Sequence, residues 1–178
     1  MKNRICTLLC LLLALPLAVS AQSWWGYDGG ADTPRHQWGI DLGVGKMADM
    51  PHGNVGFSGG LRYQYNFHHL VGIDFGANYV GQTIEHEGLG PSVLQGLIGL
   101  RGRTPTFYRD MAGTLGIRMG YGHDFWCKEG GLALELNVGM YVTPHFMVGY
   151  FYNMQKLKFE ANNDAKYKFH GFRLGFVF

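Results

Sequence analysis

Apolar and polar residues alternate with a period of two along most of the chain. In the segment 38–45, Trp38, Ile40, Leu42 and Val44 share one parity, while Gly and Asp residues occupy the other. Strict alternation is typical of β-strands whose two faces meet different surroundings. Further segments with this pattern follow, giving eight in all, at 38–45, 55–66, 71–79, 94–101, 114–122, 132–142, 146–153 and 171–178. The sequence therefore predicts an all-β domain of eight strands.

The connections between these strands differ in length. Tight connections are expected at 66–69, 104–106 and 143–145, and longer polar connections at 46–54, 81–92, 122–130 and 157–167. Outer-membrane barrels alternate in this way, with short periplasmic turns and longer outer loops. We therefore expect an eight-stranded antiparallel up-and-down transmembrane β-barrel over residues 37–178, preceded by an irregular periplasmic leader at 22–36.

The first residues of the chain have the features of an export signal. Lys2 and Arg4 precede an apolar run that ends near Ala18, and small residues at 19 and 21 suit cleavage after Ala21. These features predict a signal peptide at 1–21 and export through the inner membrane to the cell outer membrane. The alternative is an uncleaved N-terminal anchor.

The expected mature part has 178 − 21 = 157 residues, which fits one domain. It keeps 15 − 2 = 13 basic residues against 13 acidic ones, so its formal charge is zero. It has no basic stripe, and we therefore expect no nucleic-acid partner. Cys127 is the one cysteine left after cleavage, which excludes an intramolecular disulfide.

The composition of the polar face decides which side of the strands meets lipid. A soluble, lipocalin-like barrel also alternates, but its polar face would carry many Lys, Glu and Thr residues. Here that face is mostly Gly, with a few charges of both signs. Small residues suit the narrow interior of an eight-stranded barrel, where buried charges must pair. We predict a filled polar lumen with a charge network of Asp41, Arg62, Asp74, Arg101, Arg118, Glu135 and Arg173.

One pair in this network can be predicted from the strand register. A loop centred near Cys127 places residues whose numbers sum to about 253 opposite each other, which pairs Arg118 with Glu135. Arg62 or Arg173 could compete for Glu135 from across the narrow lumen.

Aromatic residues on the apolar face gather near the strand ends, as expected for two girdles at the membrane interfaces. The periplasmic group is Trp38, Tyr65, Phe146, Phe176 and Phe178, and the outer group is Tyr79, Tyr121, Tyr152 and Phe172.

The signal peptide, the eight Gly-rich strands and the terminal Phe178 resemble the small Gram-negative outer-membrane barrels of the OmpA and OmpX type, and more loosely the outer membrane protein β-barrel domain and porin-family proteins. In that family the barrel-assembly machinery reads the last strand. The resemblance implies an assembly signal of Phe172, Leu174, Phe176 and Phe178, although Arg173 replaces the usual small residue. It implies outer-membrane lipid and lipopolysaccharide as surroundings, and we expect a monomer with a structural or surface-interaction role.

Two chemical alternatives can be weighed on the sequence. A lipid A-modifying barrel enzyme needs a Ser nucleophile with a His base, but the mature serines are Ser23, Ser58 and Ser92, and the His-x-Ser spacing of lipid A deacylases is absent. The residues Glu85, His86 and Glu87 lie in the same expected loop as Ser92. His52, His86 and His123 fall on expected outer loops near Cys127, but no two of these four have a ligand spacing. We therefore expect no catalytic site, no metal and no cofactor.

The third alternative is a narrow pore for small solutes. Barrels of about 16–18 strands leave an aqueous channel, whereas eight-stranded barrels are filled by side chains. We do not expect a general diffusion porin.

Overall fold

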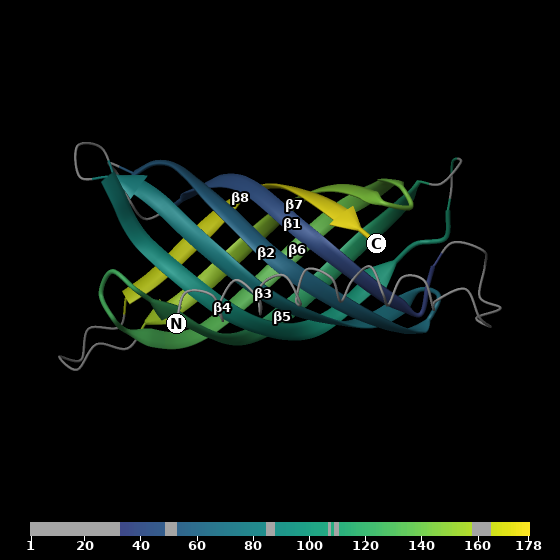
Figure 1. The fold of residues 1–178 in the computed structure, drawn as a ribbon, viewed down its shortest axis with the longest axis horizontal. Helices are drawn as coiled ribbons and strands as arrows, with labels where there is room; N and C mark the ends of the chain where they lie inside the picture. The colour runs from purple at the N-terminus through teal and green to yellow at the C-terminus, as the bar shows by residue number, and fades with distance from the viewer. Residues whose placement is uncertain (1–32, 49–52, 85–87, 107, 109–110, 158–164) are drawn as a thin grey trace, which may run out of the picture.

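Eight antiparallel strands close into a barrel in chain order (Figure 1). The computed structural model describes residues 33–48, 53–84, 88–106, 108, 111–157 and 165–178. The strands are β1 (His36–Met47), β2 (Gly53–His68), β3 (Val71–Ile84), β4 (Gly88–Arg103), β5 (Ala112–Asp124), β6 (Gly130–Thr143), β7 (Phe146–Leu157) and β8 (Ala165–Val177). The predicted eight-stranded antiparallel barrel is confirmed.

The barrel closes where β8 pairs with β1. Their register runs from Gly39 opposite Val177 to Met47 opposite Phe169. Beyond the strand end, Phe178 and Trp38 exchange backbone hydrogen bonds of 2.8 and 3.3 Å. Closure leaves no unpaired strand edge, which is the condition for spanning hydrocarbon with β-structure.

The two ends of the barrel are distinguished by their connections. We call the end with the start of β1 and the end of β8 the terminal end; it also carries the connections 69–70, 104–111 and 144–145. The opposite end, here the loop end, carries the connections 48–52, 85–87, 125–129 and 158–164. The expected signal peptide and most of the expected leader lie outside the described residues. β1 begins at His36, one residue before the expected start of the barrel.

Two expectations about the connections were wrong. The β3–β4 hairpin keeps pairing to Ile84 and Gly88, so its connection is much shorter than the expected loop at 81–92. Pro91 fits within β4 because the β3–β4 register shifts beside it, between Gly81 and Thr83, and a bulge tolerates a residue that has no N–H. The connection after β4 runs from 104 to 111 and is not the tight turn expected at 104–106.

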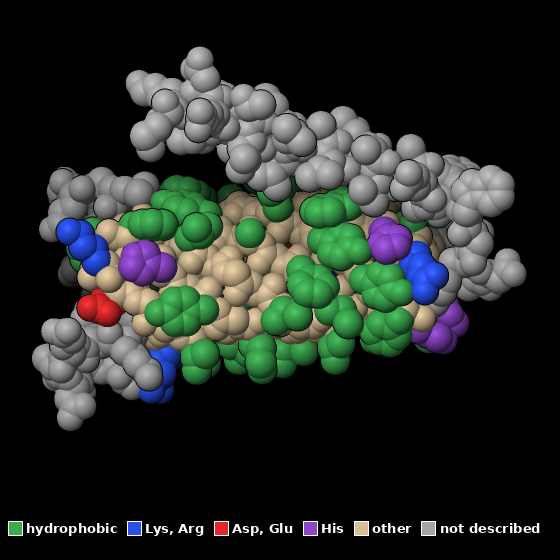
Figure 2. Space-filling model, turned by 60° about the horizontal axis from the view of Figure 1, so that its bottom comes forward, with side chains coloured by type: hydrophobic (Ala, Val, Ile, Leu, Met, Phe, Trp, Pro, Cys, Tyr) green, Lys and Arg blue, Asp and Glu red, His purple; other side chains and the backbone are tan. Residues whose placement is uncertain are grey.

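The exterior of the barrel is apolar and its interior is largely polar. Leu132 is 68% exposed and Leu115 66%, whereas Arg118 and Glu135 are fully buried. On the face seen in Figure 2, hydrophobic side chains are spread along the wall between the two ends, with areas of backbone and other side chains between them, and charged side chains lie near the ends. A water-soluble barrel would have the opposite arrangement. Among the described residues, no helix is long and apolar enough to cross a membrane.

A glycine on the interior face leaves room for the backbone of the neighbouring strand. Gly99 is the register partner of Arg118, and a Cβ built on Gly99 would collide with the carbonyl oxygen of Ile117. By contrast, Gly96 points outward, and a Cβ there would meet nothing within 4 Å. The two glycines of one strand therefore serve different surroundings.

Candidate functional site

Charged side chains from seven strands meet in the lumen. The seven residues expected in the charge network are each at most 3% exposed. Every strand except β7 supplies one of them, and β7 supplies Asn153 to the same layer. The pattern requires a closed barrel, because residues on strands far apart in sequence can meet only across a narrow lumen. They are Asp41, Arg62, Asp74, Arg101, Arg118, Glu135 and Arg173.

Glu135 is the central acceptor of this layer. Arg118 lies directly opposite Glu135 in the β5–β6 register, as the loop-centred count predicted, and donates to Oε1 from Nε at 3.2 Å and also from Nη2. Arg173 reaches the same carboxylate from β8, with Nη1 2.6 Å from Oε1 and Nη2 2.8 Å from Oε2. Asn78 donates to Oε2 at 3.0 Å. One carboxylate thus joins β3, β5, β6 and β8.

The two aspartates extend the layer. Asp74 accepts from Arg101 Nε at 2.6 Å and lies 3.5 Å from Arg118 Nη1. Asp41 lies 3.4 Å from Arg62 Nε and 3.9 Å from Arg173 Nη1. Arg62 therefore pairs with Asp41, while Arg173 is the competitor that reaches Glu135. The seven residues carry four positive and three negative charges.

Amide side chains continue the polar contacts on both sides of the charged layer. Toward the loop end, Asn153 and Gln95 exchange hydrogen bonds of 2.7 and 2.9 Å, and Gln95 donates to Gln155 at 3.1 Å. Toward the terminal end, Gln64 donates to Asn66 at 2.7 Å, and Asn66 donates to the carbonyl of Pro34 at 2.7 Å. Buried polar groups that are hydrogen-bonded in this way give the lumen a defined packing.

Two apolar clusters, which the sequence interpretation missed, flank the charged layer. The loop-end cluster comprises Met47, Val80, Phe151 and Phe169, and the terminal-end cluster comprises Ala112, Tyr141, Met147 and Val177. These residues occupy the parity that was expected to be polar. Met147 and Phe151 carried a signal in the sequence, because each is a large apolar side chain opposite a glycine of β8, Gly175 and Gly171.

Arginines join the clusters to the polar layer. The guanidinium of Arg173 lies 4.2 Å from the ring centre of Phe151, and that of Arg103 lies 4.6 Å from the ring centre of Tyr141. Such contacts are favourable cation–π interactions, and more so away from water. Beside Arg173, a cavity of about 10 Å³ has room for about one water molecule. The charged layer of the lumen thus has apolar side chains on both of its sides.

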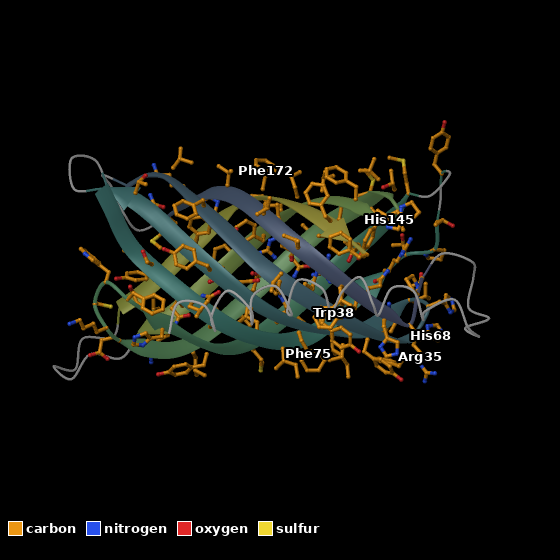
Figure 3. All side chains as sticks on the ribbon, in the orientation of Figure 1. Arg35, Trp38, His68, Phe75, His145 and Phe172 are labelled. Carbon is orange, nitrogen blue, oxygen red and sulfur yellow. The ribbon has the colours of Figure 1, made fainter. Side chains whose placement is uncertain are left out.

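The residues of the expected assembly signal lie at the end of the chain, and all of them point away from the lumen. Phe172 is 75% exposed, and Leu174, Phe176 and Phe178 are 40 to 45% exposed. Figure 3 shows Phe172 on the outside of the barrel, and Trp38 and Phe75 nearer the terminal end, where Arg35, His68 and His145 lie. Phe146 and Phe176 are register partners with ring centres 5.3 Å apart. This arrangement suits two aromatic girdles around an apolar band.

The connection between β5 and β6 presents two aromatic side chains at the loop end. Phe125 is 55% and Trp126 53% exposed. Buried Asp124 fixes the turn, since its Oδ1 accepts from the backbone N–H of Trp126 at 2.8 Å and from that of Ser92 at 3.3 Å. The Phe125 backbone N–H donates to the Ser92 carbonyl at 2.9 Å. The two rings therefore stand on a braced turn.

The candidate catalytic and metal-binding residues do not form a site in the part of the chain that the structure describes. Ser58 faces the lumen, and the Ser92 hydroxyl donates to the Gly90 carbonyl at 3.0 Å. His123 lies against Phe125, with ring centres 5.4 Å apart. No group of three or more His, Cys, Asp or Glu that could hold a metal is present among the described residues. The remaining candidates, Ser23, His52, Glu85, His86 and Glu87, lie outside the described residues.

Comparison with known proteins agrees with this geometry. The family described as outer membrane protein beta-barrel domain matches residues 7–178. The crystal structure of Neisserial surface protein A aligns with a TM-score of 0.59 at 16% identity, over 80% of this chain and 95% of that one. Ail, the attachment invasion locus protein of Yersinia pestis in complex with the heparin analogue sucrose octasulfate, aligns with a TM-score of 0.50 at 15% identity, over 81% of this chain and 99% of that one. No curated protein matches the chain. At these identities the structural likeness shows the fold.

Proposed function

Because the chain belongs to the outer membrane protein beta-barrel domain family and forms a closed barrel in the outer membrane, we propose that it acts through its outward surface and not through its lumen. The observation that carries the proposal is the ionic layer of the lumen, where Glu135 binds Arg118 and Arg173 between two apolar clusters. A solute would have to separate buried ion pairs, which costs several kcal/mol per ion. The signal peptide at 1–21 would export the chain, and the barrel-assembly machinery would insert it as a monomer.

The loop end would face the cell exterior, as in barrels that keep both chain ends in the periplasm. There Phe125 and Trp126 form an exposed aromatic pair on a turn braced by Asp124. Aromatic side chains carry much of the binding energy in protein interfaces, and a rigid turn loses little entropy on binding. The names of Neisserial surface protein A and of the attachment invasion locus protein Ail support a surface role.

Cys127 offers a direct test of orientation because it lies on this turn and is partly exposed. Intact cells are treated with a membrane-impermeant maleimide, and labelling is compared with that of a Cys127→Ser variant carrying Tyr108→Cys at the terminal end. We expect labelling at position 127 and not at position 108. The reverse pattern would place the loop end in the periplasm and refute the surface role.

A label-transfer reagent on Cys127 then identifies what the turn contacts on intact cells. The matched variant, Phe125→Ser with Trp126→Ser, keeps Asp124 and its backbone contacts. A surface role predicts a neighbour that is labelled by the native chain and lost in the variant. Identical neighbours in both would refute the aromatic pair as a contact surface.

Planar-bilayer recording tests the lumen separately. The purified barrel should show no large, stable conductance. A steady current from the folded monomer would instead support the narrow-pore alternative.

A further inference from the structure

An apolar groove of about 590 Å³ lies on the outer wall of the barrel, where β1 and β2 meet β3 and β8. Its volume is within the range of small-molecule sites. Gly59 has no side chain to fill the groove, and a Cβ at this position would meet only the Leu42 side chain, at 3.8 Å. The outward-facing residues that line the groove are Leu42, Val44, Phe57, Gly59, Tyr79, Phe172 and Leu174, and between them the wall is formed by Gly43 and by Ser58, whose side chain faces the lumen.

Basic side chains stand directly above this groove on the loop-end side. Val44 and Phe172 of the groove are register partners, and the next outward pair on the same two strands is Lys46 opposite His170. That step is two residues, about 7 Å along a strand. The Tyr150 hydroxyl and His170 Nδ1 are hydrogen-bonded at 2.6 Å, which holds the imidazole at the rim of the groove.

The same outward face of β8 continues with lysines. Lys168 and Lys166 follow His170 at alternate positions, and Lys156 of β7 is the register partner of Lys166. Lys46 and Lys166 are exposed. Four lysines from three adjacent strands thus lie beyond the apolar band, at the level where the headgroups of the loop-end leaflet would begin. They are Lys46, Lys156, Lys166 and Lys168.

We propose that this wall binds one phosphorylated lipid of the loop-end leaflet, with an acyl chain in the groove and its phosphate against Lys46, Lys168 and the neighbouring lysines. The occupant follows from two adjacent features. The apolar groove opens into the lipid-facing band, where an acyl chain is the available ligand, and the charge above it is complementary to a phosphate headgroup. In an outer membrane, the loop-end leaflet supplies such a lipid as the phosphorylated lipid A part of lipopolysaccharide. This site goes beyond the proposed surface role, because the barrel wall forms it without the aromatic turn.

The test uses the full mature chain, refolded in detergent, with lipid A and dephosphorylated lipid A as probes. Native mass spectrometry counts bound lipid as its concentration rises. The headgroup variant is Lys46→Gln with Lys168→Gln, and its control is Lys128→Gln. Lys128 lies in the β5–β6 connection, and neither β5 nor β6 pairs with a strand that lines the groove. A groove variant, Gly59→Phe, has Gly96→Phe as its control, because Gly96 also points outward into open space. Heat-modified gel mobility shows that each variant is folded.

We expect one lipid A per barrel, and about tenfold or greater weakening in the headgroup variant, since each lysine near an anionic lipid contributes roughly fivefold. Gly59→Phe should weaken binding to a similar extent, dephosphorylated lipid A should bind weakly, and both controls should behave like the native chain. If the headgroup variant or Gly59→Phe binds lipid A as tightly as the native chain does, the proposed site is wrong. Sucrose octasulfate is a further probe. If it binds more tightly than lipid A, and if Gly59→Phe does not weaken its binding, the lysines bind a soluble polyanion and the lipid proposal is wrong.

Discussion

Removing the charge of Glu135 tests whether the lumen is a packed ionic core. In Glu135→Gln the side chain keeps its size, but Arg118 and Arg173 lose the carboxylate that lies within hydrogen-bonding distance of both. Their remaining anions are Asp74, 3.5 Å from Arg118, and Asp41, 3.9 Å from Arg173. The charge balance of the layer changes from four against three to four against two. Breaking a buried pair by removing one partner costs about 3–5 kcal/mol.

Urea unfolding of the refolded barrel, followed by tryptophan fluorescence, measures this cost. For a slope of about 2 kcal/mol per molar urea, the midpoint should fall by about 2 M. The heat-modification temperature on unboiled gels should fall with it. Glu129→Gln is the control, because Glu129 lies in the β5–β6 connection and its backbone carbonyl, which accepts from Asp124 N–H at 2.7 Å, is retained.

A second substitution separates charge from packing. Replacing Arg118 and Glu135 together by methionine should cost less than the sum of the single changes, because no uncompensated charge of that pair remains. If the free energy of unfolding of Glu135→Gln lies within about 1 kcal/mol of that of the native chain, water screens these charges, and the inference of a packed lumen is wrong.

Three further predictions concern separate parts of the chain. Gly99→Ala should destabilise the barrel by roughly 1–3 kcal/mol, because the new methyl group would clash with the Ile117 carbonyl, whereas Gly96→Ala should be nearly neutral. The same urea titration compares the two variants, and equal unfolding midpoints would contradict the faces assigned to these glycines. Deleting Phe178 should slow assembly, seen as delayed appearance of the heat-modifiable form in pulse-chase, and an unchanged rate would remove it from the assembly signal. Burial raises the pKa of the Cys127 thiol, so less thiolate is present at neutral pH than in a free cysteine. Maleimide labelling should therefore be slow at pH 7 and rise through pH 9, and a plateau already reached at pH 7 would contradict the shift.

Much of the fold could be predicted from local pattern. Alternation in segments such as 38–45 and 114–122 identified strands, because side chains of a strand point to opposite faces in turn. Counting outward from the centre of one loop, near Cys127, paired Arg118 with Glu135, since an antiparallel register is fixed once its loop is placed. The strand ends near Ile84 and Gly88 could not be predicted in this way, because ladder pairing carries the β3–β4 hairpin through a bulge despite Pro91.

The sequence by itself determined the strands, the two faces and seven of the buried charges, because these follow from residues close together along the chain. It did not identify Arg103 or Asp124, which are buried as well. Only the tertiary structure decided that Arg173 shares Glu135 with Arg118, that Phe151 and Phe169 pack inside the barrel, and that Lys46 stands beside His170. The Lys46–His170 pair crosses the closure between β8 and β1, whereas the other two contacts join β8 to β6 and β7; in each case the shear of the barrel sets which residues share a level. Alternation specifies which side a residue faces, and only the closed barrel specifies what it meets there.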